Sequence, residues 1–339
     1  MDWKQQSVLV TGGASFISSH LIDLLIAKGA RRIRVVDDLS SGRLANIEGH
    51  IASGVVEFHR EDLLAPGVPQ RMVAGIDVVF HLAAIHGGRG YVDLHQAACS
   101  QNLALDGMLV KAAHEAGVGK FVFASSGCVY PNHLQSDVRQ ELYLTEEMVG
   151  PPYDADNMYG WAKLMTEMTL RAYARDFGLK AASCRFFTVY GERGVENHAV
   201  IAMIARAFVR QNPFEVWGDG TQIRNWTYVG DIVAGMVCAA ETIDDGTAVN
   251  LGTEERTRVI DAVHEVLRYT GHESEIKLLP HMPTGPLNRV ASNRLAKELL
   301  GWEPQVKFMD GLHRTIDWYF SSRQRDVVSG YLAEMLTER

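Results

Sequence analysis

The sequence predicts an α/β protein built on a doubly wound parallel sheet, with a smaller and discontinuous α/β lobe attached to it. Two observations predict the sheet: short apolar runs alternate with amphipathic segments through the first half of the chain, and the runs have strand length whereas the segments have helix length. A third observation predicts the lobe, because this regular alternation stops after about Arg185.

The strands and helices of the sheet domain follow one another along the chain. Strands are expected at residues 8–11, 33–36, 55–59, 78–82, 121–125 and 182–185. Helices are expected at residues 16–28, 70–74, 95–116 and 158–177. Strands that alternate with helices form a parallel sheet covered on both faces.

The remaining elements predict the second lobe. Residues 199–210 and 292–300 have a helical pattern, and residues 214–231 hold two short β-like runs around a Gly-Asp-Gly turn. A helix at 231–241 is expected to return to the sheet. The predicted division is therefore a sheet domain of residues 1–187 with 226–250, and a lobe of residues 188–225 and 251–339 at the carboxyl edge of the sheet.

Composition excludes several classes of function. The net charge of -8 and the pI of about 5.9 argue against nucleic acid as a main partner. The four cysteines lack the spacing of metal ligands, so we expect neither a metal site nor an oxidising compartment. The N-terminus enters a strand at once, and no apolar run approaches the ~18 residues of a membrane span. A cytoplasmic protein is expected.

The first strand runs into a glycine-containing turn and then an apolar-periodic helix. This is the position at which a dinucleotide pyrophosphate binds a helix N-terminus in a Rossmann-type domain. Of the usual G-x-x-G-x-x-G pattern only Gly12 is present, and the small residues Ser15 and Ser18 replace the other two glycines. The motif alone is weak evidence.

Asp37 strengthens the dinucleotide prediction. It ends the second strand, where a carboxylate binds the adenosine ribose hydroxyls and repels a 2′-phosphate, so NAD is favoured over NADP. A solvated turn at Asp37 and Asp38 is the alternative. Asp62 can reach the adenine. The expected cofactor contacts are Gly12, Ser15, Phe16, Ile17, Asp37, Asp38, Asp62, Leu63, Leu82, Ala83, Ala84, Asn102, Tyr159 and Lys163.

Tyr159 and Lys163 stand four residues apart, so they share one face of the predicted helix. A nearby ammonium favours the phenolate of a tyrosine, which lets it act as an acid-base group near neutral pH. Ser126, at the end of the fifth strand, can hold the same substrate oxygen. An incidental pair on a helix is the alternative for the tyrosine and lysine taken alone.

With these motifs in order, the chain resembles the extended short-chain dehydrogenase/reductase family of nucleotide-sugar epimerases and dehydratases. The resemblance runs from about Ser7 to Tyr319. It includes the stretches "TGGASFIS", "VVDDLSSG", "VFHLAA", "FASSGCVYP", "YGWAK", "GDGTQIRNWTYVGD" and "LGWEP". It implies a redox triad of Ser126, Tyr159 and Lys163, a nucleotide-diphosphate sugar gripped by Arg224 and Arg289, and a homodimer.

Within this family the chain is most similar to the GDP-mannose 3,5-epimerases. The similarity lies in "HGGRGY" at residues 86–91, in Cys128 two residues after Ser126, and in "FEVWGDG" at residues 214–220. It implies a GDP-sugar and substrate contacts from Gly88, Arg89, Gly90, Thr188, Trp217, Arg224 and Arg289. The chain departs from that pattern twice, because His198 stands where a lysine is expected and Thr188 where an asparagine is expected.

The residue types suit epimerisation through a C4 ketone. Oxidation at C4 makes the hydrogens on C3 and C5 acidic, and Cys128 and His198 are the candidate base and acid. The alternative for both is that they merely line the pocket of an enzyme that inverts C4 alone. A dehydratase of the family is disfavoured by Gly127-Cys128 after the serine. A non-catalytic NAD-binding regulator is disfavoured by the complete triad.

Overall fold

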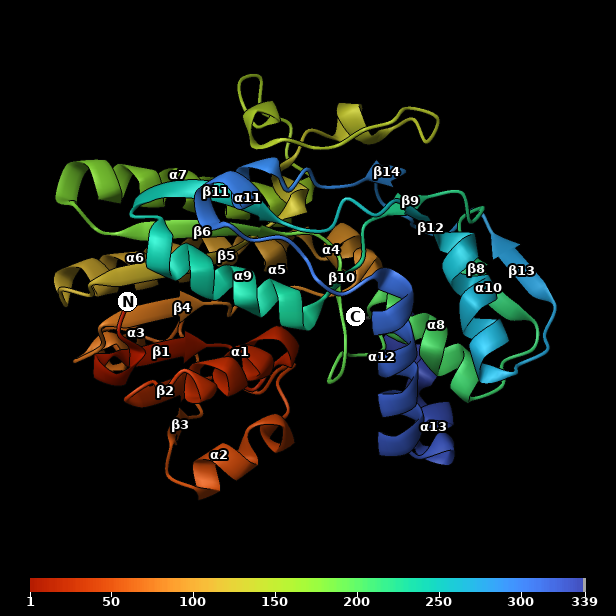
Figure 1. Cartoon of the computed structure of the whole chain (residues 1–339), viewed down its shortest axis with the longest axis horizontal. Coiled ribbons are helices and arrows are strands. Elements are labelled where there is room, and N and C mark those ends of the chain that lie inside the picture. The colour runs from red at the N-terminus through yellow and green to blue at the C-terminus, as the bar shows by residue number, and fades with distance from the viewer. Residues whose placement is uncertain (338–339) are drawn as a thin grey trace.

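The computed structural model describes residues 1–337 and has a seven-stranded parallel sheet at its centre (Figure 1). The strand order is β11-β6-β5-β4-β1-β2-β3. These strands are β1 (Ser7–Thr11), β2 (Arg32–Val36), β3 (Val56–His59), β4 (Val78–His81), β5 (Lys120–Ser126), β6 (Ala181–Phe186) and β11 (Asp245–Leu251). The order reverses between β1 and β4, which places the crevice at the carboxyl ends of those two strands.

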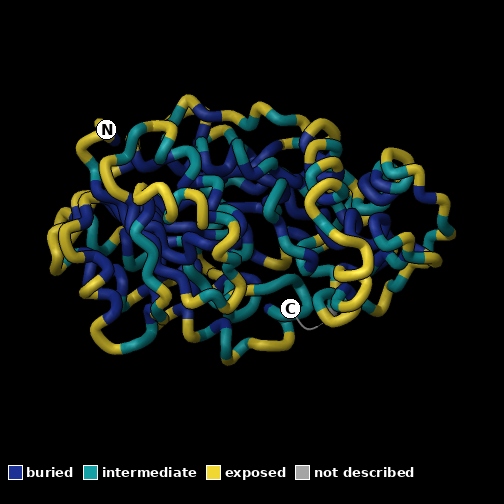
Figure 2. Tube along the Cα trace, turned by 90° about the horizontal axis from the view of Figure 1, so that it is seen from below, coloured by how far each residue is buried: buried dark blue, intermediate teal, exposed yellow. Residues whose placement is uncertain are grey.

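Helices cover both faces of the sheet, as an apolar parallel sheet requires. One core lies between the sheet and α1 (Phe16–Ala27) with α9 (Val229–Thr242). A second core lies on the opposite face, under α3 (Val68–Val73), α6 (Asn102–Glu115) and α7 (Asn157–Phe177). Figure 2 shows the buried strands inside and the exposed loops outside. The predicted fold class is confirmed, and the six predicted strand starts differ from the observed ones by at most one residue.

Two predicted helices have different bounds for local reasons. The helix expected at 95–116 is two helices, α5 (Gln96–Ser100) and α6, because the Gln101 amide bonds to the Ala98 carbonyl three residues back and tightens the turn. The helix expected from residue 292 is α11 (Arg294–Leu300), because the Ser292 amide donates instead to the Leu144 carbonyl.

The second lobe lies beyond the carboxyl edge of the sheet, on the right of Figure 1. It has its own apolar core, shared by α8, α10, α12 and α13. Its helices are α8 (Ala199–Phe208), α10 (Val259–Thr270), α12 (Phe308–Ser322) and α13 (Arg325–Thr337). Its strands are β8 (Phe214–Trp217), β9 (Ile223–Arg224), β12 (Thr257–Arg258), β13 (Ile276–Leu279) and β14 (Asn288–Arg289).

Short elements join the two parts. β7 (Val189–Tyr190) pairs with β10 (Thr227–Tyr228), after which α9 and β11 return to the sheet domain. Before the lobe, α2 (Glu48–Ala52) follows β2 and α4 (Arg89–Leu94) follows β4. The residue boundaries of the two domains stay a prediction.

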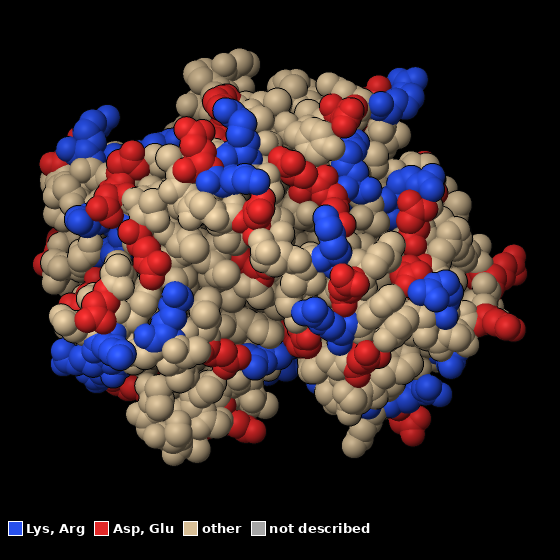
Figure 3. Space-filling view, viewed as in Figure 1, with Lys and Arg blue, Asp and Glu red and all other residues tan. Residues whose placement is uncertain are grey.

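The molecular surface carries mixed charge. On the face shown in Figure 3, lysines and arginines alternate with aspartates and glutamates, and neither sign forms a continuous field. Within residues 1–337, no helix combines the length and the apolar character needed to cross a bilayer.

Candidate active site

The turn between β1 and α1 is shaped to hold a phosphate. Gly12 has a φ of 63°, and a Cβ on it would lie 3.0 Å from the Ala83 Cα, so only glycine fits here. Ser15, the N-cap of α1, makes no side-chain cap hydrogen bond. The first-turn amides of α1, from Phe16 and Ile17 onward, are therefore left for an anionic ligand.

The Asp37 carboxylate lies beside this turn. It accepts the backbone amides of Ala14 at 3.0 Å and Leu39 at 2.8 Å, and the Ser15 hydroxyl is 3.5 Å away. Gly42 packs over it, since a Cβ there would lie 2.7 Å from both carboxylate oxygens. Burial raises the pKa of Asp37, which leaves a poorly solvated acceptor that suits ribose hydroxyls. These residues fit the adenosine half of NAD.

The loop after β4 is fixed from two sides. The Thr11 hydroxyl accepts the amides of Leu82 and Ala83 at 3.1 and 3.0 Å, and the buried Asn102 side chain bonds both backbone groups of Ile85. This fixes the path of Ala84 between them. Leu63 is buried nearby in the same core.

The other two acidic residues of the predicted cofactor site have local partners. The Asp38 side chain accepts the Ser40 amide, and the exposed Asp62 side chain accepts the Leu64 amide, each at 2.8 Å. Both are Asx turns that shape their loops. Their contacts with NAD stay predictions.

Ser126, Tyr159 and Lys163 meet at the carboxyl end of β5. Ser126 is the last residue of β5, and its side chain accepts the Cys128 amide at 3.1 Å. Tyr159 and Lys163 share one face of α7, with the lysine ammonium 5.6 Å from the tyrosine ring centroid and 4.5 Å from that of Phe123. The predicted triad is therefore a spatial cluster.

Burial and nearby charges set the pKa values of Tyr159 and Lys163. Burial raises the pKa of Tyr159, Cys128 and Asp106 raise it further, and the Ser126 hydroxyl lowers it. Burial lowers the pKa of Lys163, whereas Asp106 and Cys128 raise it. A cationic ring beside Tyr159 would favour its phenolate, which is the form that removes a proton.

Cys128 lies directly against the triad because α7 has a glycine there. A Cβ on Gly160 would lie 2.3 Å from the Cys128 carbonyl oxygen, so only glycine permits this approach. The thiol is half-buried, and Arg289 Nη1 donates to Cys128 Sγ at 3.3 Å. A guanidinium in contact with sulfur stabilises a thiolate.

Three arginines gather around one carboxylate. Arg289 and Arg89 both donate to Asp156 Oδ2, at 3.0 and 2.7 Å, and Arg289 also donates to Gln135. Burial raises the pKa of Asp156, but Arg289 and Arg89 outweigh this effect and hold it below its usual range. Burial and the other two arginines lower the pKa of Arg224 to about 9.

A cavity of about 450 Å³ opens beside this arginine cluster. It is lined by Arg89, Asn132, Gln135, Ser136, Asp156, Gly285, Pro286 and Leu287. Three guanidinium groups and two carboxylates, Asp156 and the Asp93 that pairs with Arg89, leave one local positive charge in a chain whose net charge is -8. This local excess of positive charge suits an anionic group such as a diphosphate.

His198 lies beside a second histidine. Its ring centroid is 6.2 Å from that of His86, and burial lowers the pKa of His198 to about 4. Burial, His198 and Lys163 also lower the pKa of His86, although the ring of His86 is exposed, so solvent screens part of this effect. At neutral pH, His198 is therefore a neutral imidazole, which accepts a proton more readily than it donates one.

The remaining predicted substrate residues lie in three different segments of the fold. Gly88 and Gly90 flank Arg89 at the start of α4, Thr188 lies between β6 and β7, and the half-buried Trp217 ends β8. Their contacts with substrate stay predictions.

Sequence reasoning missed two residues of this site. Asp156 organises the arginines, and its place three residues before Tyr159 was the only available signal. His86 was not among the predicted site residues, although it belongs to the "HGGRGY" stretch named above. Within residues 1–337, no group of three or more His, Cys, Asp or Glu side chains could hold a metal ion.

The fold and this site are those of an NAD-binding enzyme of the Rossmann type, and comparison with known proteins agrees. Residues 8–252 match the model of the NAD dependent epimerase/dehydratase family, and the chain belongs to that family. The predicted cofactor, NAD, and the predicted enzyme class, an NAD-dependent isomerase, are thereby confirmed.

Three known proteins show which members of the family the chain is similar to. GDP-mannose 3,5-epimerase 1 of Oryza sativa is 30% identical over 330 residues, covering 95% of this chain and 84% of that protein. An uncharacterised UDP-glucose epimerase of Bacillus subtilis is 31% identical, covering 94% and 99%. The structure of UDP-glucuronic acid 4-epimerase from Bacillus cereus, in complex with UDP-glucuronic acid and NAD, aligns with a TM-score of 0.83 and 28% identity over 92% of this chain and 98% of that one.

Proposed function

We propose that the protein epimerises a nucleotide-diphosphate sugar at C3, C5 or both, through a transient C4 ketone, with Cys128 as a base. The observation that carries this proposal is the hydrogen bond from Arg289 Nη1 to Cys128 Sγ at 3.3 Å, two residues after Ser126 of the triad. A thiol that merely filled space would have no need of a cation, whereas a thiol that removes a carbon-bound proton does.

Each residue has a task that follows from its surroundings. Bound NAD would supply the reversible oxidation of C4. Tyr159 takes the proton of the C4 hydroxyl, Ser126 hydrogen-bonds the same oxygen, and Lys163 favours the phenolate. Cys128 then takes a proton from the carbon next to the ketone, and the opposite face of that carbon must receive one. His198, as a neutral imidazole, relays that proton from solvent, because its ring accepts a proton at one nitrogen as it gives up the proton on the other.

The proposed substrate contacts rest on the charge of the arginine cluster and on the similarity to known proteins. Arg224 and Arg289 bind the diphosphate, and Arg89 adds the third positive charge of the cluster. A GDP-sugar is favoured because the GDP-mannose 3,5-epimerase relatives match 95% and 97% of this chain. Tight retention of NAD, the homodimer and the cytoplasmic location stay predictions.

Epimerisation at C4 alone is the second candidate. It is favoured by the relatives named for UDP-glucose and UDP-glucuronic acid, whose identities of 31% and 28% are close to that of the 3,5-epimerase. In this case Cys128 and His198 line the pocket, and the ketone only has to present its other face to the cofactor.

One experiment separates the two candidates. The enzyme is incubated in deuterated water with GDP-mannose and, separately, with UDP-glucose and UDP-glucuronic acid, and the label is located by NMR. Deuterium at C3 or C5 of any of them supports enolisation. A C4 epimer formed without carbon-bound deuterium would replace our proposal with the second candidate.

A further inference from the structure

Four buried polar side chains form a continuous hydrogen-bonded chain beneath the triad. The Thr11 hydroxyl bonds His81 Nδ1 at 2.8 Å, His81 Nε2 bonds Asp106 Oδ1 at 3.0 Å, and the Thr166 hydroxyl donates to Asp106 Oδ2 at 2.7 Å. None of the four is more than 4% exposed. This series of hydrogen bonds links β1, β4, α6 and α7. None of its four side chains takes part in the proposed reaction.

The direction of each hydrogen bond follows from the available donors. The Thr11 oxygen already accepts two backbone amides, so its own proton points to His81 Nδ1. His81 therefore carries its proton on Nε2 and donates it to Asp106. The Thr166 hydroxyl has one proton and two acceptors, Asp106 Oδ2 at 2.7 Å and the Ala162 carbonyl at 3.0 Å. The shorter contact assigns the proton to Asp106, so both carboxylate oxygens act as acceptors.

This carboxylate lies next to the turn of α7 that carries Lys163. Thr166, which holds Asp106, is three residues after Lys163 on the same helix. Lys163 is 2% exposed, and among residues 1–337 no carboxylate pairs with it directly. A buried ammonium needs a negative charge within the protein, because water cannot supply one.

We propose that Asp106 is a positioning residue of the Tyr159–Lys163 pair: its carboxylate supplies the countercharge of the buried ammonium and, through Thr166, holds the turn of α7 on which that ammonium sits. This inference rests on the proposed roles of Tyr159 and Lys163. The pKa directions agree with it, because Asp106 is the largest influence that raises the pKa of Lys163 against burial.

Other titratable groups also face the pair, and the test must allow for them. Cys99 of α5 and Cys128 lie near Tyr159, and His86 lies near Lys163 from the loop after β4. His81 of β4 faces Asp106 itself. A change at position 106 leaves Cys99, Cys128 and His86 as they are, and His81 keeps an acceptor in the amide oxygen of an asparagine.

The test is the pH profile of kcat for Asp106→Asn, with the substrate that the wild type turns over. Asparagine keeps the shape and one acceptor but removes the charge. Without that charge Tyr159 ionises more easily and Lys163 loses its proton more easily. Both the acid limb, set by Tyr159, and the basic limb, set by Lys163, of the bell-shaped pH profile should therefore move to lower pH. The loss of kcat at the optimum should be smaller than the ~10²-fold or greater loss expected for Tyr159→Phe.

Two further variants keep the result unambiguous. Thr166→Val removes one hydrogen bond but leaves the charge, so it should lower kcat without moving the limbs. Asp106→Ser removes the same charge and leaves space that water can fill from the adjoining cavity of about 200 Å³, should the asparagine variant not fold. Unmoved limbs in both charge-removing variants would overturn the inference. A fully active Tyr159→Phe variant would instead overturn the proposed function.

Discussion

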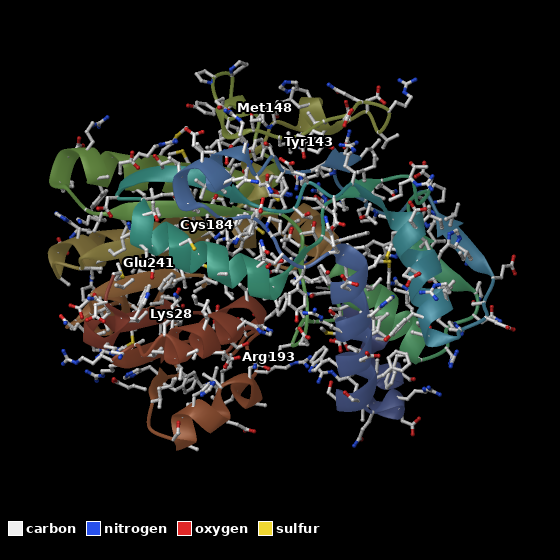
Figure 4. The ribbon with its side chains drawn as sticks, in the orientation of Figure 1. Lys28, Tyr143, Met148, Cys184, Arg193 and Glu241 are labelled. Carbon is white, nitrogen blue, oxygen red and sulfur yellow. The ribbon has the colours of Figure 1, made fainter. Side chains whose placement is uncertain are left out.

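Cys128 and Cys184 show how surroundings decide the chemistry of one residue type. Cys184 is fully buried between β6 and α9, where Figure 4 labels it, and burial raises its pKa to about 12. Cys128 is half-buried beside Ser126 and in contact with the guanidinium of Arg289. The first is a packing residue, whereas the second has the partner that a proton-removing thiol requires.

Replacing Cys128 by serine should therefore remove one step and leave another. We expect Cys128→Ser to lose deuterium uptake at C3 and C5, because a hydroxyl is far less acidic than a thiol. Transient oxidation at C4 should persist, since it needs only Ser126, Tyr159 and Lys163. Cys184→Ala is the matched control and should keep wild-type label uptake despite a lower Tm. Unchanged uptake in Cys128→Ser would identify the thiol as pocket lining.

Asp37 is a second residue whose surroundings make a prediction. Because burial raises its pKa, the folded protein without cofactor holds this proton more tightly than the unfolded chain does. Stability of that form therefore falls as pH rises through this pKa, and at neutral pH the ionised carboxylate costs stability. Asp37→Asn should weaken NAD binding by roughly tenfold or more, because it removes the charge and sets an amide donor against one of the two backbone amides that the carboxylate accepts. Calorimetry measures the affinity of each protein for NAD, and equal affinities would contradict the assigned role.

The residues that could be predicted from the sequence belong to motifs with a fixed spacing. The residues that were missed make their side-chain contacts only with parts of the chain that are distant in sequence. Tyr159, Lys163 and Asp37 stand at fixed offsets from strands or from each other, so their places could be predicted. Asp156 and Asp106 have no such signature, because their partners lie 133 and 25 residues away in the chain. Only the folded arrangement shows that one holds two arginines and the other a histidine.

At the level of elements, α7 and the short helix η3 (Gly127–Val129) must touch for the site to form. Gly160 permits this contact, and the Asp156 amide strengthens it by donating to the Cys128 carbonyl at 2.8 Å. The sequence predicted α7 to within one residue and predicted no helix at residues 127–129. It did not reveal their contact, because a glycine inside a helix has several possible reasons.

Gly160→Ala should therefore separate these elements. The added methyl group meets a backbone oxygen that has no alternative rotamer, so we expect a loss of about 1–3 kcal/mol in the free energy of unfolding and a large fall in kcat. Gly330→Ala is the control, since Gly330 lies in α13 and its added Cβ would meet nothing within 4 Å. That variant should be as stable as the wild type or more so. Chemical denaturation checks both, and a stable, active Gly160→Ala variant would exclude the tight contact.

At the scale of the whole molecule, one loop connects the two parts at the crevice. Residues 191–198 carry His198 at one end and bond to α1 through Arg193, whose guanidinium donates to Asp23 at 2.7 Å; Figure 4 labels Arg193. In the same loop the buried Glu196 accepts the hydroxyls of Tyr319 and Tyr331, from α12 and α13, at 2.9 Å each. The C-terminal helices thus hold the loop that presents His198, although the sequence beyond residue 322 gave no indication of this.

The last prediction concerns the face formed by α6 and α7. Leu103, Trp161 and Met165 are exposed there, at 42%, 37% and 45%, around a groove of about 200 Å³ between the two helices. Monomers rarely leave a row of large apolar side chains in water, and paired helices are suited to pack on a symmetric copy. We therefore expect a homodimer through this face.

Met165→Glu should convert that dimer to a monomer, because two buried carboxylates would face each other near the symmetry axis. Val327→Glu, which adds the same charge at a 56% exposed position on α13, should leave the dimer intact. Light scattering coupled to size-exclusion chromatography measures both masses. Tyr159 and Lys163 lie on the same helix as Met165, so the monomer should also lose part of its activity. A monomeric wild type, or a Met165→Glu variant that stays dimeric, would assign this face to something other than self-association.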